Sequence, residues 1–388
     1  MLDGITIERF KAAFKPGLVQ LRPFTVIIGR NGSGKSTLLE ALQWLDTTMR
    51  HDARRASERY YGVGDLINLR TQTSPGFFKL KLTWTGGTLA RPVTYEVRVQ
   101  QDAHDDHMPR IAREQLSAGK RSWIGTEKGG TRVLFPKDQR RRVPFHETDR
   151  LALARGGSPD EEGGSDPLAV LRDFWTRAVF LRLSPNRLAA GSPARRASFE
   201  PLLDEEGHNL PALLTELDRA QRKELVSKVR DVLPDIVAVK VEKPRAGRDV
   251  RINYLLSEKM PYVGRAGLST FDIPAWMLSE GTRRITALLA LLVHSPPPSL
   301  LCVEEIENGL DPWTVKTILA ELQAASDRGI QVVLTTHSPW LLDHVLLEDI
   351  IHVRREQGET RYLRFAHRDE IREFAAAVPP GTRYVTAP

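Results

Sequence analysis

A glycine-rich segment near the start of the sequence has the residue types that hold a phosphate. It fits the pattern G-x-x-x-x-G-K-[ST], with the residues Gly29, Arg30, Asn31, Gly32, Ser33, Gly34, Lys35, Ser36 and Thr37. The glycines let successive backbone N–H groups converge on the β- and γ-phosphates of a nucleotide, and a following helix adds its positive end. Lys35 should reach the β/γ oxygens and Ser36 should hold Mg²⁺. The segment therefore predicts a site for a nucleoside triphosphate with magnesium.

Two acids and a histidine later in the sequence each follow an apolar segment. Ser299–Val303 ends in Glu304 and Glu305, and Gln331–Leu334 leads through two threonines to His337. Because strands alternate with helices here, we expect a parallel sheet whose strands end at one shared edge. Adjacent side chains at a strand end point in different directions, so one carboxylate can face a metal ion and the other a water molecule. The alternative for the histidine is a structural hydrogen bond.

These groups need strands and helices to position them, and the apolar pattern predicts such elements. Phe24–Ile28 is a short apolar run, expected to be a buried strand that leads into the glycine-rich loop. Ser36–Met49 has apolar residues at helical spacing and should leave the loop as a helix. In the last third, the sequence LSEGT precedes a strongly apolar helix over Ile285–Val293, and Pro312–Ala325 is amphipathic.

The region after the first expected helix is more polar. His51–Arg59 is rich in arginine and is expected to be exposed. Phe77–Trp84 and Val93–Val99 alternate apolar and polar residues, which predicts half-buried antiparallel strands. Asp102–Asp166 is rich in glycine, proline and charge, so we expect an insertion with a few short strands and a flexible linker.

The middle of the chain alternates helix and strand signals. Ala178–Leu183 is expected to be a strand, and Asn209–Leu233 is expected to be helical with a break near Asp218. Ile236–Val241 and Val250–Leu255 are expected to be strands.

Composition excludes several classes of protein. The 388 residues are 41% hydrophobic, yet no run of about 18 apolar residues predicts a membrane span. Cys302 is the only cysteine, which excludes an internal disulfide and a cysteine-built zinc site and suits a cytoplasmic protein. The net charge is +7, and Arg110–Arg150 holds 11 Lys or Arg against 5 Asp or Glu. This stretch is a candidate contact for double-stranded DNA, or else a solvated loop or a site for an acidic partner.

The order of the motifs resembles the nucleotide-binding head of ABC-type ATPases of the SMC, RecF and OLD kind. The resemblance is carried by ITIERFKAAF, LRPFTVIIGRNGSGKSTLLEAL, LSEGTRRITALLALL, VEEIENGLDP and VLTTHSPWLLD, over Leu2–Leu45 and Trp276–His344. The sequence looks most like small stand-alone bacterial members labelled "AAA family ATPase", without a long coiled coil or a TOPRIM nuclease domain. The resemblance implies an α/β P-loop fold, with a mixed or parallel sheet flanked by helices, an antiparallel β subdomain and an inserted α/β arm.

The resemblance also implies roles for the motif residues. Gly29–Thr37 would bind ATP, with Mg²⁺ held by Ser36 and, through water, by Glu304. Glu305 would be the general base that polarises the attacking water, and His337 would sense the γ-phosphate. This assignment agrees with the needs of phosphoryl transfer, which are charge neutralisation, positioning and a base.

A second set of implied roles concerns another subunit. In this family the signature, here Ser279 and Gly281, contacts the γ-phosphate bound to the other subunit, and Asn308–Asp311 crosses to that subunit. We therefore expect a head-to-tail homodimer, or a higher homo-oligomer, that sandwiches ATP and is released by hydrolysis.

We expect one ATPase head made of four parts. These are an N-terminal lobe with the phosphate loop and antiparallel strands, a basic insertion, a helical and β arm, and a C-terminal lobe with the signature, both acids and the histidine. Their bounds are 1–101, 102–166, 167–270 and 271–388.

Three functions are compatible with these features. The first is an ATPase switch that controls a separate effector, a nuclease or toxin, in bacterial anti-phage defence. The second is a RecF-like ATPase that clamps DNA in repair or recombination, which the basic stretch Arg110–Arg150 favours. The third is a transporter ATPase, which the SMC-like N-terminus and the lack of a well-placed Q-loop glutamine disfavour; Gln72 is misplaced for that role. No N-K-x-D motif supports a GTPase.

Overall fold

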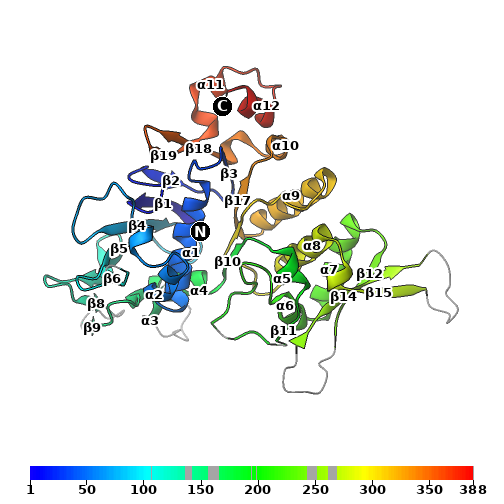
Figure 1. Ribbon diagram of the computed structural model, residues 1–388, viewed down its shortest axis with the longest axis horizontal. Coiled ribbons are helices and arrows are strands. Elements are labelled where there is room, and N and C mark those ends of the chain that lie inside the picture. Colours follow the sequence, from blue (N-terminus) through cyan, green and yellow to red (C-terminus); the bar gives the residue numbers. More distant parts are fainter. Residues whose placement is uncertain are drawn as a thin grey trace. The chain divides into compact units, whose positions relative to one another are not determined.

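The chain folds into two compact units, and each contains both strands and helices (Figure 1). The first unit is Met1–Thr176 together with Val345–Pro388, and the second is Arg177–His344. The structure, a computed structural model, describes residues 1–105, 107–135, 142–155, 166–193, 195–197, 199–242, 251–260 and 269–387. Among these residues no helix has the length and hydropathy to cross a membrane.

The larger sheet of the first unit is antiparallel and has the order β2-β1-β4-β5-β6-β7-β8-β9. The expected strand pair β4 and β5 is confirmed, with Phe78, Leu80 and Leu82 of β4 fully buried. The strands are β1 Leu2–Glu8, β2 Leu18–Gln20, β4 Phe77–Trp84, β5 Val93–Gln101, β6 Pro109–Ala118, β7 Arg121–Thr126, β8 Arg132–Leu134 and β9 Val143–Phe145.

Residues 102–155 extend this sheet and do not form a separate insertion. Strand β6 pairs with β5 over nearly its whole length, so the expected boundary at 101/102 falls between two paired strands. Ile111, Leu116 and Ile124 are buried, although charged residues surround them in the sequence. Most of the polar residues that suggested an insertion lie on the sheet face opposite to these buried residues. An antiparallel sheet can expose one of its faces to water. The glycine-rich part of the expected linker, residues 156–165, lies outside the described residues.

A second set of strands in the first unit carries the phosphate loop. Strand β3 (Phe24–Gly29) runs parallel to β18 (Ile350–Glu356), which pairs antiparallel with β19 (Glu359–Arg364). The segment 345–388 therefore groups with the N-terminal residues, whereas the sequence analysis had placed it in a C-terminal lobe over 271–388. The helical segments are α1 Lys35–Arg50, α2 Ala53–Glu58, η1 Gly64–Leu66, α3 Ala152–Arg155, α4 Pro167–Thr176, η3 Leu347–Asp349, η4 Phe365–His367, α11 Asp369–Arg372 and α12 Pro380–Thr386.

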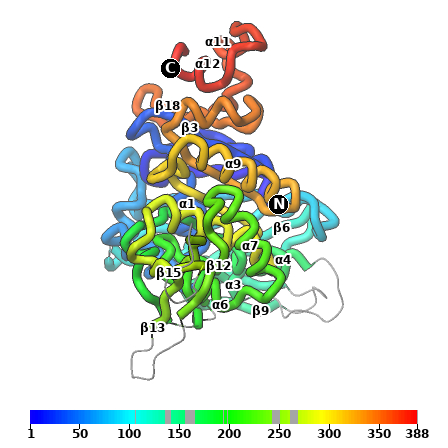
Figure 2. Tube along the Cα trace, turned by 90° about the vertical axis from the view of Figure 1, so that its right-hand side faces the viewer, coloured from blue at the N-terminus to red at the C-terminus, as the bar shows by residue number. Residues whose placement is uncertain are grey.

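Helix α1 packs on the antiparallel sheet through aromatic contacts. The rings of Trp44 and Phe78 lie 5.0 Å apart at a steep angle, and those of Phe10 and Phe78 lie 5.1 Å apart. The C-terminal helices α11 and α12 lie beside β18 in both views (Figure 2).

The stretch His51–Arg59 was expected to be exposed, and this expectation is wrong for one of its faces. It forms α2, capped by Asp52, whose carboxylate accepts the backbone N–H of Arg55 at 2.7 Å. Ala53, Ala56 and Ser57 are buried. The indole N–H of Trp44 in α1 donates to the Ser57 hydroxyl at 3.2 Å. These small residues form a face at helical spacing that the surrounding arginines conceal in the sequence.

The second unit combines parallel strands with an antiparallel arm. Its parallel strands are in the order β10-β16-β17, as the last third of the sequence predicted. Its antiparallel strands are in the order β12-β14-β15. The strands are β10 Ala178–Leu181, β11 Ser192–Pro193, β12 Ile236–Val241, β13 Arg251–Ile252, β14 Tyr254–Lys259, β15 Thr270–Pro274, β16 Leu300–Val303 and β17 Gln331–Thr336.

The helices of the second unit start and end close to their expected positions. The predicted break near Asp218 is confirmed, because Asp218 and Gln221 form a reciprocal cap that starts a new helix. Val250, the start of one expected strand, lies outside the described residues. The helical segments are α5 Pro185–Ala189, α6 Leu210–Glu216, α7 Arg219–Val232, η2 Ala275–Met277, α8 Glu280–Val293, α9 Pro312–Asp327 and α10 Pro339–Leu342. The expected α/β class with an antiparallel β subdomain is confirmed.

Candidate functional site

The phosphate loop lies in the first unit, where the sequence placed it. Strand β3 is buried along its whole length and ends at Gly29, and α1 begins at Lys35. Gly32 and Gly34 have φ angles of 71° and 105°, which favour glycine. A Cβ on Gly29 would lie 2.3 Å from the Val353 carbonyl oxygen of β18. The loop conformation therefore depends on its glycines.

Lys35 spans the inside of this loop. Its ammonium group donates to the carbonyl oxygens of Gly29 at 2.8 Å and Arg30 at 3.1 Å. Ser36 and Thr37 follow in the first turn of α1, while Arg30 and Asn31 are exposed. Lysine and the helix N-terminus thus concentrate positive charge at one loop, as a triphosphate requires.

Two side chains of strand β19 form hydrogen bonds to the phosphate loop, and the sequence analysis missed this support. The Tyr362 hydroxyl donates to the Gly34 carbonyl at 2.9 Å, and the Thr360 hydroxyl lies 3.1 Å from the Ser33 carbonyl. A Cβ on Gly34 would lie 2.7 Å from the Thr360 hydroxyl. Burial raises the pKa of Tyr362, so its hydroxyl stays a neutral donor. The available signal was the alternation of Thr360 and Tyr362 with arginines in a short strand.

Glu304 and Glu305, which follow β16 in the second unit, have different backbone conformations and hydrogen bonds. The Glu304 backbone N–H donates to Leu181 of β10 at 2.8 Å, which continues the pairing of the sheet. Glu305 has a φ angle of 50°, in the left-handed region that non-glycine residues seldom adopt. Its backbone N–H donates to the Thr335 hydroxyl at 3.0 Å. Such strain is concentrated at functional sites.

Glu305 and His337 lie close together at the ends of neighbouring strands. The Glu305 carboxylate is 3.7 Å from Nε2 of His337, and its other oxygen accepts the Asn308 amide at 2.6 Å. The two side chains are 43% and 39% exposed, so water reaches both. The structure therefore brings together the predicted base and the predicted γ-phosphate sensor.

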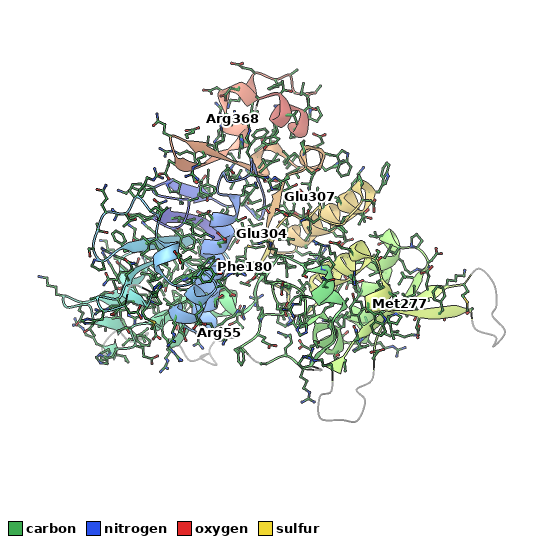
Figure 3. The ribbon with its side chains drawn as sticks, viewed as in Figure 1. Arg55, Phe180, Met277, Glu304, Glu307 and Arg368 are labelled. Atoms are coloured by element: carbon green, nitrogen blue, oxygen red, sulfur yellow. The ribbon has the colours of Figure 1, made fainter. Side chains whose placement is uncertain are left out.

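Glu307 is a further residue of this group that sequence reasoning missed. Its carboxylate accepts the backbone N–H of His337 at 2.6 Å and so fixes the turn after β17. Figure 3 shows Glu304 and Glu307 in the same part of the second unit. The sequence signal was the third acid in Glu304-Glu305-Ile306-Glu307.

The signature residues lie at the start of α8. Ser279 is the N-cap, and its hydroxyl accepts the backbone N–H of Thr282 at 3.1 Å. A Cβ on Gly281 would lie 2.8 Å from the Gly309 carbonyl, so glycine lets α8 approach the loop after β16. The signature and the loop Asn308–Asp311 therefore lie side by side within the second unit.

Three arginines of the basic stretch Arg110–Arg150 form ion pairs within it. Arg132 is buried and pairs with the buried Glu114 at 2.9 Å. Arg142 pairs with Glu127 at 3.1 Å and Arg150 with Glu147 at 3.4 Å. Arg140 and Arg141 lie outside the described residues. The described part of the stretch keeps eight Lys or Arg against four Asp or Glu, so the DNA contact expected here stays a prediction.

Comparison with protein families gives one match over most of the chain. The family described as "AAA domain, putative AbiEii toxin, Type IV TA system" matches residues 24–343. One similar protein is an energy-coupling factor transporter ATP-binding protein of Mycoplasmopsis synoviae, 42% identical over 69 residues. Another, from Caldanaerobacter subterraneus subsp. tengcongensis, is named "Putative ABC transporter ATP-binding protein" and is 35% identical over 66 residues. These alignments cover 18% and 17% of this chain, and 21% and 26% of the relatives.

Comparison with solved structures shows the fold. An SMC head bound to the C-winged helix domain of ScpA matches with a TM-score of 0.55 and 15% identity, covering 93% of this chain and 96% of that one. An SMC head with an extended coiled coil, bound to a ScpA domain from Pyrococcus furiosus, matches with a TM-score of 0.55 and 12% identity, covering 93% of this chain and 95% of that one. The predicted resemblance to ABC-type ATPases of the SMC-head kind is confirmed.

Proposed function

The chain belongs to the family of ABC-type P-loop ATPases described as "AAA domain, putative AbiEii toxin, Type IV TA system", and from that premise we propose that it is an ATP-hydrolysing switch that works as a homodimer. Members of such families generally use ATP with Mg²⁺. The observation that carries the proposal is the close approach of Glu305, Asn308 and His337 at the end of β16 and β17. This group supplies a water-activating base beside a phosphate sensor.

The donor atoms fit a magnesium ion. Mg²⁺ prefers oxygen ligands and keeps several waters. The Ser36 hydroxyl, at the start of α1, and the Glu304 carboxylate, at the end of β16, are the oxygen donors that would hold it. The ion would neutralise charge on the transferred phosphoryl group.

In the proposed reaction the residues of this chain divide the work. Lys35 and the backbone N–H groups of residues 29–37 bind and orient the β- and γ-phosphates. Glu305 positions the attacking water and accepts its proton, while Asn308 fixes the orientation of that carboxylate. His337 donates to the γ-phosphate.

The signature residues Ser279 and Gly281 complete the site of a second copy in this proposal. Two copies arranged head to tail would then hold two ATP molecules between them, and hydrolysis would release the copies. This gives a two-state switch controlled by the γ-phosphate.

We propose that the switch controls a separate effector, a nuclease or toxin, in bacterial anti-phage defence, and that it acts in the cytoplasm. The family description, which names a toxin and a toxin–antitoxin system, supports the effector. The single, buried cysteine suits a reducing compartment. The second candidate is a RecF-like ATPase that clamps DNA, supported by the net charge of +7 and the SMC-head fold.

The test compares Glu305→Gln with the wild type and with Glu348→Gln, an exposed acid in η3. The amide keeps the shape of Glu305 but cannot accept the proton. Glu305→Gln should bind ATP, lose turnover and accumulate dimers in sedimentation experiments, while Glu348→Gln should behave as the wild type. Lys35→Ala should bind no nucleotide. Wild-type hydrolysis by Glu305→Gln would remove Glu305 from the role of base.

A further inference from the structure

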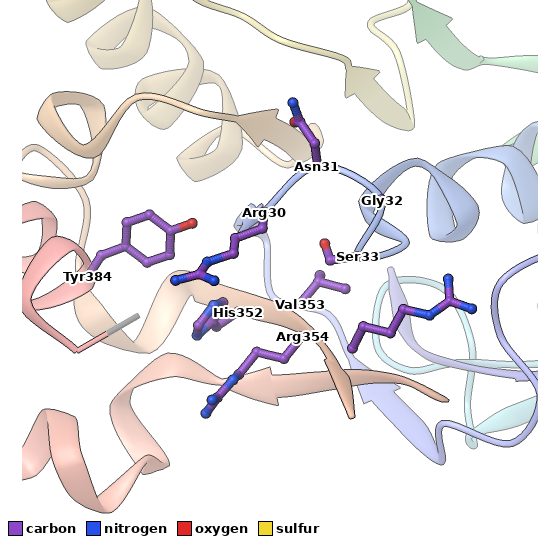
Figure 4. A pocket seen from close by; sticks show the side chains of 9 residues that line it. Arg30, Asn31, Gly32, Ser33, His352, Val353, Arg354 and Tyr384 are labelled. Carbon is purple, nitrogen blue, oxygen red and sulfur yellow. The ribbon is translucent and has the colours of Figure 1, made fainter. Parts of the chain in front are cut away.

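We propose that a pocket beside the phosphate loop binds a phosphate group of a nucleic-acid backbone. The pocket lies within the first unit and has a volume of about 290 Å³. Loop residues 30–33, β18 residues 352–355 and Tyr384 of α12 line it. Figure 4 shows the Arg30 side chain extending across His352 toward Tyr384. Three of the lining side chains are guanidinium groups, those of Arg30, Arg354 and Arg355.

The positive charge of this pocket is not neutralised by the protein. Within the described part of the chain, no carboxylate forms an ion pair with Arg30, Arg354 or Arg355. Glu370 is near Arg354, but it pairs with Arg368 at 3.5 Å. Arg354 also stands directly opposite Arg361 in the β18–β19 pair. Like charges in that position destabilise a sheet, and a bound anion would relieve the repulsion.

The remaining lining groups also favour an anion. The Arg368 guanidinium donates to Nδ1 of His352 at 2.7 Å, so His352 is a neutral acceptor on that side. Burial, and then the charges of Arg368, Arg354 and Arg30, lower the pKa of His352 to about 3. The Ser33 side chain is 4% exposed, and its hydroxyl has no hydrogen-bond partner among the described residues. Guanidinium and hydroxyl donors are the groups with which proteins contact phosphates of nucleic acids.

The pocket shares residues 30–33 with the phosphate loop, but its residues from β18 and α12 have no assigned part in ATP hydrolysis. Lys35 and Ser36 do not line it, and the Lys35 ammonium group is turned to the carbonyls of Gly29 and Arg30. Arg361, which lies directly opposite Arg354 in the hairpin, is exposed and adds a cation outside the pocket lining. Several neighbouring cations match a polymer with repeated phosphates better than one small anion. The inference goes beyond ATP hydrolysis, because it assigns a second ligand to the residues of β18 and α12 next to the loop.

The experiment measures binding of a fluorescent DNA duplex to the full chain by anisotropy, without nucleotide or magnesium, over a range of salt concentrations. The double variant Arg354→Ala/Arg361→Ala should bind at least about tenfold more weakly at low salt. The slope of log K against log salt should become shallower by about 0.9 for each lost phosphate contact. Arg187→Ala, which removes an exposed arginine paired with Glu206, is the matched control and should bind as the wild type.

Two results would overturn the inference. One is wild-type affinity and salt slope in the double variant. The other is displacement of the duplex by inorganic phosphate at concentrations too low to act as salt, which would assign the pocket to a small anion. A variant with lysine at both positions should retain most of the binding, which separates loss of charge from misfolding.

The same preparations distinguish this inference from the proposed function. Neither Arg354 nor Arg361 belongs to the hydrolytic group, so ATP turnover without DNA should be unchanged in the double variant. If the wild type hydrolyses no ATP but the double variant still loses duplex binding, the proposed function fails and the pocket stands.

Discussion

The hydroxyl of Tyr362 offers a direct test of how the loop is held. Tyr362→Phe removes the donor to the Gly34 carbonyl at 2.9 Å without changing the ring. That carbonyl keeps a second partner, the backbone N–H of Thr37 at 3.2 Å, so it is not left without a hydrogen bond. The loss should therefore be near that of one neutral hydrogen bond, about 1 kcal/mol, rather than the larger cost of an unpaired buried group.

This loss should appear in two measurements. Urea unfolding should show a free energy of unfolding lower by about 1 kcal/mol. Calorimetric titration with ATP should show a Kd raised by up to about fivefold, the equivalent of that energy. The turnover number should not change, because the hydroxyl contacts a loop carbonyl and no reacting group is assigned to it. Tyr95→Phe is the control, since its hydroxyl bonds to Glu114 at 3.0 Å, away from the loop. Its stability should fall while its ATP affinity stays unchanged. Equal ATP affinities for Tyr362→Phe and the wild type would show that this hydrogen bond does not hold the loop in its ATP-binding conformation.

Three further predictions concern other buried or positioning groups. His352 has a pKa of about 3 when folded and an ordinary value of 6.5, so the unfolded chain binds more protons between these values. Stability should fall as pH falls through that window, and His352→Asn should lose this dependence in denaturant unfolding; the raised pKa of Asp46, about 6, acts in the opposite direction but is common to both proteins. Glu114→Gln should cost about 3–5 kcal/mol in urea unfolding, because it leaves the buried Arg132 unpaired. Glu307→Gln should lower the turnover number with little change in ATP affinity, because it weakens the hold on the His337 backbone; an unchanged turnover number would exclude that positioning role.

Motifs defined by spacing were predictable from the sequence. The phosphate loop needs glycines at fixed positions between a strand and a helix, and this local requirement is visible in Gly29–Thr37. The acids and histidine were equally accessible, because each follows a short apolar strand. The approach of Glu305 to His337 follows from the parallel pairing of β16 with β17.

The supporting residues were not predictable in the same way. Thr360 and Tyr362 reach the loop because β18 pairs with β3 more than 300 residues away in the sequence, and no local pattern encodes that pairing. The burial of Arg132 was not predictable for a related reason. It pairs with Glu114, which lies two strands away in the sheet, in β6. Composition counts charges but does not report their partners.

The central claim, that ATP is hydrolysed between two copies, is tested most directly by the hydrolysis rate per chain as protein concentration is raised. We predict a rate per chain that rises with concentration and then levels off as dimers form. Ser279→Arg, which places a bulky cation in the signature, should abolish the rise. A constant rate per chain at all concentrations, still dependent on Lys35, would contradict the claim and place the complete site within one copy.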